Sequence, residues 1–101
     1  MSDLDTLRRL ALGQPDATEQ SHHGRPSFRV GGKIFVTVPD PEHANLMLDE
    51  EQIRAFAAEL PGCEEQWWGK KLLALRVELE SLDEESLAGL VADAYARRAA
   101  K

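Results

Sequence analysis

A glycine pair at positions 31 and 32 separates two short segments, residues 27–30 and 33–38, in which aromatic and β-branched side chains predominate. Glycine readily adopts the positive φ angles that a two-residue hairpin turn requires, so the pair predicts a tight antiparallel hairpin. This loop length sets three cross-strand pairs: Val30 with Lys33, Arg29 with Ile34, and Phe28 with Phe35. One face is then expected to carry Phe28, Val30 and Phe35, and the other Arg29, Ile34, Val36 and Val38.

The remaining periodicity predicts three helices and further strands. Apolar residues recur at helical spacing over residues 3–13, from Asp49 to Leu60, and after Ser81 or Asp83 toward the C-terminus, with Gln52 as a capping-box partner of Asp49. Alternating patterns predict strands at 19–23 (a short edge strand), 44–48, 63–68 and 71–79. Strand runs grouped without βαβ alternation indicate an α+β fold. We expect a single domain over residues 1–101, with an antiparallel sheet of about five strands and three main helices packed mainly on one face.

The second predicted hairpin turns near Gly69 and Lys70, between residues 63–68 and 71–79. Strict alternation predicts that one face of its second strand carries Leu73, Leu75, Val77 and Leu79. The other face is then expected to carry Leu72, Ala74, Arg76 and Glu78.

Charge is distributed unevenly in this chain, whose formal net charge is −6. Residues 21–38 carry three basic residues and no acidic one, and residues 67–76 repeat that pattern. The intervening residues 39–66 carry eight acidic residues and one basic residue, Arg54. The basic residues therefore lie in the two predicted hairpins, whereas a uniformly acidic protein would repel nucleic acid.

Five stretches occur in a recognisable order: Ser21-His22-His23-Gly24-Arg25-Pro26-Ser27-Phe28, Val30-Gly31-Gly32-Lys33-Ile34-Phe35, Leu60-Pro61-Gly62, Trp68-Gly69, and Asp83-Glu84-Glu85 leading to Ala94-Tyr95-Ala96. In these stretches the chain resembles the MmcQ/YjbR-like family over nearly its full length. The resemblance implies a compact α+β fold similar to the frataxin-like CyaY architecture. It also implies DNA binding through a double-wing arrangement of hairpins, and a structural role for Trp68, which leaves Trp67 exposed. It supplies no catalytic residues.

The hypothesis that follows is a small binding protein whose two basic hairpins neutralise DNA phosphates. The candidate phosphate-binding residues are Arg25, Arg29, Lys33, Lys70, Lys71 and Arg76. Stacking on bases is assigned to His22, His23 and Trp67. Two alternatives stay open: the same basic and aromatic face docks an acidic protein partner, or the charges only keep sheet edges soluble.

The sequence gives little support for a metal site, a cofactor or catalysis. Adjacent residues of a strand point to opposite faces, so His22 and His23 are not expected to bind one ion, even together with His43. Cys63 is followed by Glu64 and Glu65, whose negative charge would raise its pKa, which favours a structural role. Acidic residues at helix starts are explained by the helix dipole. We expect a non-enzymatic protein without a cofactor and leave catalysis open.

The expected compartment is the cytoplasm, with no membrane partner. Apolar runs are only a few residues long, too short to cross a bilayer. The first residues, Met1-Ser2-Asp3-Leu4-Asp5, lack the features of a signal peptide. A lone cysteine also fits a reducing environment.

Overall fold

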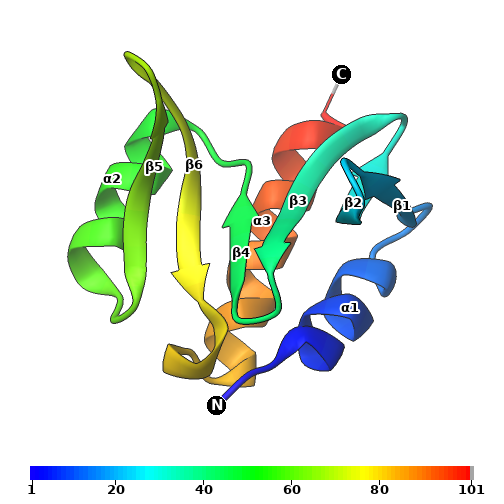
Figure 1. The fold of residues 1–101 in the computed structure, drawn as a ribbon, viewed down its shortest axis with the longest axis horizontal. Helices are drawn as coiled ribbons and strands as arrows, with labels where there is room; N and C mark the ends of the chain where they lie inside the picture. The colour runs from blue at the N-terminus through cyan, green and yellow to red at the C-terminus, as the bar shows by residue number, and fades with distance from the viewer. Residues whose placement is uncertain (101) are drawn as a thin grey trace.

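The computed structural model describes residues 1–100 and contains one antiparallel sheet of six strands with three helices (Figure 1). The elements, in chain order, are α1 (Leu4–Leu12), β1 (Thr18–His22), β2 (Arg25–Val30), β3 (Lys33–Asp40), β4 (His43–Leu46), α2 (Glu50–Glu59), β5 (Cys63–Trp68), β6 (Lys71–Glu78), a 3₁₀ turn (Leu79–Ser81) and α3 (Glu84–Ala99). The strand order across the sheet is β1-β2-β3-β4-β6-β5. The predicted α+β class is confirmed, with six strands in place of about five.

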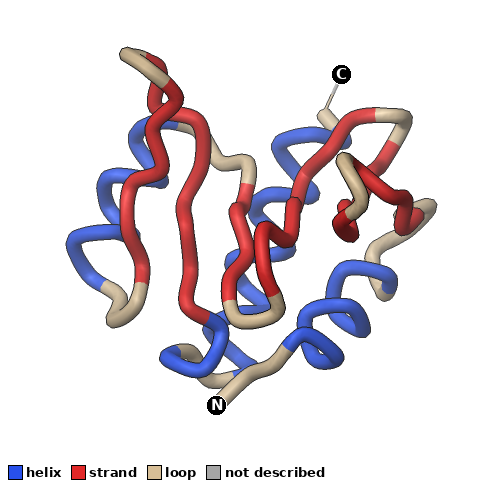
Figure 2. Tube along the Cα trace, in the orientation of Figure 1, coloured by secondary structure: helices blue, strands red, loops and turns tan. Residues whose placement is uncertain are grey.

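The helices lie on one side of the sheet. Helix α2 packs against β5 and β6, α3 packs against β2, β3 and β4, and α1 packs against α3. In Figure 2 no helix crosses the front of β3, β4 and β6, so this face of the sheet is left open. Within residues 1–100, no helix has the length and apolar character needed to cross a membrane.

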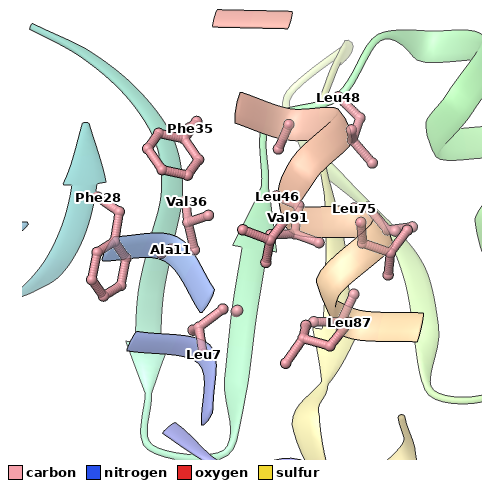
Figure 3. Close-up of a cluster of buried hydrophobic side chains, with 14 of the residues drawn as sticks. Leu7, Ala11, Phe28, Phe35, Val36, Leu46, Leu48, Leu75, Leu87 and Val91 are labelled. Carbon is pink, nitrogen blue, oxygen red and sulfur yellow. The ribbon is translucent and has the colours of Figure 1, made fainter. Parts of the chain in front are cut away.

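Apolar side chains from the sheet and from α1 and α3 fill the space between the two layers (Figure 3). Phe28, Phe35 and Val36 lie near Leu7 and Ala11 of α1. The centre of the sheet and α3 contribute a second group, which consists of Leu46, Leu75, Leu87 and Val91. Side chains buried this completely each contribute about 1.5–3 kcal/mol through removal of apolar surface from water, which makes this layer the main source of stability.

Each helix is capped by an aspartate: Asp49 as predicted, Asp83 as one of the two residues predicted for the last helix, and Asp3, for which no cap was predicted. The side chains of Asp3, Asp49 and Asp83 accept hydrogen bonds from backbone N–H groups three residues later. The predicted capping box is also present, because the Gln52 side chain accepts a hydrogen bond from the Asp49 backbone. These bonds satisfy N–H groups that the first helical turn leaves without partners.

Two bulges change the faces that simple alternation predicts. The pairs of Val30 with Lys33 and Arg29 with Ile34 are confirmed, but Phe28 pairs with Val36 and not with Phe35. The extra residue lets Phe35 and Val36 both be fully buried, so the predicted face of Val36 is wrong.

A second bulge lies in the β5–β6 hairpin. Gln66 pairs with Ala74 and Trp67 pairs with Leu72, which leaves Leu73 without a cross-strand partner. Leu72 is therefore buried in the core, whereas Leu73 is only partly buried. The faces predicted for these two leucines are wrong because a one-residue shift exchanges inward and outward positions.

Candidate functional site

The open face of the sheet is hollowed into a groove of about 670 Å³. Thr37 and Asn45 line it, and they are cross-strand partners in a row that continues to Arg76. The next row along the strands contains the buried pair Val36 and Leu46. Because successive rows alternate between faces, the groove lies on the side of the sheet opposite the core.

Cationic side chains gather in this groove from three elements. Arg25 and Arg29 come from β2, Lys33 begins β3, and Arg98 reaches the groove from the last turns of α3. The lining contains no aspartate or glutamate. This composition favours an anionic occupant.

These four cations differ in their pairing from Arg8, Arg9, Arg54 and Arg76. Within residues 1–100, none of the four groove cations forms an ion pair with a carboxylate. Elsewhere the pairs are Arg8 with Asp5 and Glu19, Arg9 with Glu84, Arg54 with Glu65, and Arg76 with Asp40. The only side-chain hydrogen bond of a groove cation to a protein group is a long one, 3.4 Å, from Arg29 Nε to Ser27 Oγ in the described part of the chain. The charge of the groove is therefore available to a ligand.

Two buried polar atoms at the groove have no hydrogen-bond partner within the described part of the chain. They are Oδ1 of Asn45, an acceptor, and Nε of Arg98, a donor. Burial, followed by the positive charge of Arg97, lowers the pKa of the Arg98 guanidinium. Buried polar groups are nearly always hydrogen-bonded, so this unpartnered pair calls for an explanation.

Trp68 lines the groove, and the expectation of a structural role for it is wrong. Its exposed fraction is 76 %, compared with 42 % for Trp67. Trp67, the predicted stacking residue, is exposed as expected, but it does not line the groove. Its Nε1 donates to Glu65 Oε1 at 3.0 Å, and Cζ of Arg54, a residue of α2, lies 5.7 Å from its ring. The two rings face opposite sides of the sheet because they belong to adjacent residues of β5.

His22 and His23 both line the groove, with ring centroids 4.4 Å apart. The expectation that they point to opposite faces is wrong, because the strand ends at His22. His23 has a φ of 53° and Gly24 a φ of 78°, as in a type I′ turn. His43 lies elsewhere, with its Nδ1 2.9 Å from Asp40 Oδ1. No group of three or more potential metal-binding side chains occurs among the described residues.

The second basic hairpin is placed differently from the first. Lys70 and Lys71 are exposed at the β5–β6 turn, outside the lining of the groove but next to Trp68. The β5–β6 and β2–β3 turns lie at the same end of the sheet (Figure 2). Arg76 lies beside the groove, 3.8 Å from Asp40, so its charge is partly compensated. The structure thus brings together Arg25, Arg29 and Lys33 but not all six predicted cations.

Sequence reasoning missed three groove residues. Arg98 could be interpreted as a cation that suits the C-terminal end of a helix dipole, and nothing local connects it to the sheet. Asn45 carried one usable signal, a polar residue between apolar ones in the strand Ala44-Asn45-Leu46. Trp68 was assigned to a structural role by the family resemblance, since alternation along the strand says only that Trp67 and Trp68 face opposite sides.

Cys63 is buried at the start of β5, as its structural interpretation requires. Burial raises the pKa of its thiol to about 11, so burial, and not the neighbouring carboxylates, is the main cause. A thiol in this setting is a poor nucleophile at neutral pH.

The family model described as YjbR matches residues 12–97. The chain belongs to the YjbR family. The match confirms the resemblance and includes every residue that lines the groove except Arg98. The comparison with curated proteins and the comparison with solved structures found no match.

Proposed function

We propose that this YjbR-family protein is a small non-enzymatic DNA-binding protein, and that the open face of its sheet is the binding surface. The observation that carries the proposal is the set of cations in one groove without carboxylate partners. Lys70 and Lys71, at the neighbouring hairpin turn, extend the positive charge beyond the groove. The proposal retains the two-hairpin hypothesis but moves its centre to the first hairpin and adds Arg98.

Salt dependence tests the phosphate contacts directly. Each phosphate that a cation neutralises contributes about −0.9 to the slope of log K against log salt concentration for duplex DNA, and about −0.7 for a single strand. Full engagement of the four groove cations predicts a slope of about −3 to −4. Fluorescence anisotropy with labelled oligonucleotides at several NaCl concentrations measures it.

A pair of charge-matched variants makes the test specific. Arg25→Gln with Arg29→Gln removes two groove cations, and Arg9→Gln with Arg54→Gln removes two ion-paired arginines from α1 and α2. The groove variant is expected to lose between about 1.4 and 1.8 of the slope, and the control variant almost none. No binding at low salt, or equal slopes in both variants, would refute the proposal.

An acidic protein partner is the second candidate. It is favoured by apolar side chains that line the groove beside the cations: Ile34, Pro39, Met47 and Leu73. Ile34, Pro39 and Leu73 are partly exposed and Met47 is buried, and partly exposed apolar surface beside cations suits a protein interface. If it is correct, proteins retained from a nuclease-treated lysate will be lost in the groove variant, and the same groove will not bind oligonucleotides.

A further inference from the structure

We propose that the groove holds one unstacked nucleotide of a single DNA strand, so that the protein binds single-stranded DNA in preference to duplex. This inference rests on the proposed function and specifies the form of its ligand. The groove, at about 670 Å³, is within the range of about 300–1,000 Å³ that is typical of sites for small organic molecules. It combines apolar walls with a few polar groups, as such sites do.

The two unpartnered atoms restrict the chemistry of the occupant. Asn45 Oδ1 accepts from an N–H or O–H donor, and Arg98 Nε donates to an acceptor, preferably an anionic oxygen. Both atoms are buried, so the two side chains must turn toward an occupant to bond it. A nucleotide supplies an N–H group on the base and an anionic oxygen on the phosphate. Inorganic phosphate could supply an O–H donor and an anionic oxygen, but it leaves apolar groove residues such as Leu73 uncovered.

The exposed ring of Trp68 favours a single strand over a duplex as the ligand of the groove. Its ring is largely exposed on the groove, which provides a flat surface on which a base can stack. In a duplex each base is covered by its neighbours, and the N–H groups of its Watson–Crick edge are paired. A base can reach both Trp68 and Asn45 only after it leaves the stack.

The test compares three oligonucleotides of equal length per strand: a single strand, its duplex and an abasic single strand that keeps the phosphates. Each is labelled and titrated with the whole chain at low salt, with anisotropy as the readout. The single strand is expected to bind roughly tenfold more tightly than either of the others, because each stacked base contributes substantially to affinity.

Variants of the two tryptophans assign the effect to the groove. Trp68→Leu is expected to reduce affinity for the single strand roughly tenfold and to leave the abasic strand unchanged. Trp67→Leu is the matched control, because Trp67 contacts Arg54 and Glu65 and not the groove. Asn45→Val provides a second groove variant, with the same expected direction.

The outcomes separate this inference from the proposed function. Equal affinity for single strand and duplex, or an unchanged Trp68→Leu variant, would overturn the inference while DNA binding stands. Absence of binding to all three oligonucleotides would overturn both. Binding of a poly-glutamate peptide in place of DNA would also overturn both and would identify the groove as a protein-docking site.

Discussion

Replacement of Asn45 by valine is expected to stabilise the fold, although the residue lies in a central strand of the sheet. Its Oδ1 is buried and accepts no hydrogen bond from residues 1–100. A buried acceptor without a partner costs about 1–3 kcal/mol, and valine removes that cost while it suits the β-strand. We take a net gain of about 1 kcal/mol, which corresponds to a rise in Tm of about 4–8 °C for a domain of this size.

Ser27→Ala is the matched control with the opposite expected sign. Ser27 lies in the same cross-strand row, opposite Thr37, but its Oγ donates to Gln20 O at 2.9 Å. Loss of a satisfied hydrogen bond is expected to lower the free energy of unfolding by about 0.5–1.5 kcal/mol. The two variants thus compare an unpartnered and a partnered polar group in one cross-strand row.

Urea denaturation and calorimetry of both variants measure the difference. The m-value should stay constant, because neither substitution changes the surface that unfolding exposes by much. A lower Tm for Asn45→Val at unchanged m-value would refute the reasoning. It would mean that Asn45 Oδ1 has a hydrogen-bond partner in the native protein. The groove would then not offer an unpartnered acceptor to a ligand.

Three further predictions concern other parts of the chain. Gly31→Ala should destabilise the protein by about 1–2 kcal/mol, because Gly31 has a φ of 58°. Gly89→Ala, in the interior of α3, should stabilise it by about 0.5–1 kcal/mol, and urea denaturation measures both changes. Cys63, with its raised pKa and buried thiol, should react with Ellman's reagent at pH 8 only after denaturation. A hydrogen bond from His43 lowers the pKa of Asp40. Its stabilisation is therefore present above the ordinary pKa of 3.8 and lost as pH falls through the lowered value, so Asp40→Asn should reduce the acid sensitivity of the unfolding free energy.

Local sequence patterns predicted the helices and the turns well, because helix caps and tight turns each depend on a few adjacent residues. Asp49 with Gln52 forms the predicted capping box, and the Gly31–Gly32 pair forms the predicted turn. The faces of the strands were harder to predict. Alternation assumes an uninterrupted ladder, and the bulges at Phe35 and Leu73 depend on packing between layers that distant residues supply.

The candidate site was predictable in part for the same reason. Arg25, Arg29 and Lys33 lie within nine residues of one another, so one hairpin was enough to bring them together. Arg98 belongs to the last helix and joins them only because α3 packs behind β2 and β3. Tertiary placement of this kind leaves no trace in local composition.

The architecture also explains how a chain with a net charge of −6 can present a cationic face. Eight acidic residues occupy N-caps or first turns of helices, where the helix dipole favours negative charge. They are Asp3, Asp5, Asp49, Glu50, Glu51, Asp83, Glu84 and Glu85. The helices lie on one side of the sheet and the groove on the other, and none of these eight residues lines the groove. An approaching polyanion is attracted most strongly at the groove, whose lining holds four cations and no carboxylate, so the segregation of charge within the fold would orient DNA on it.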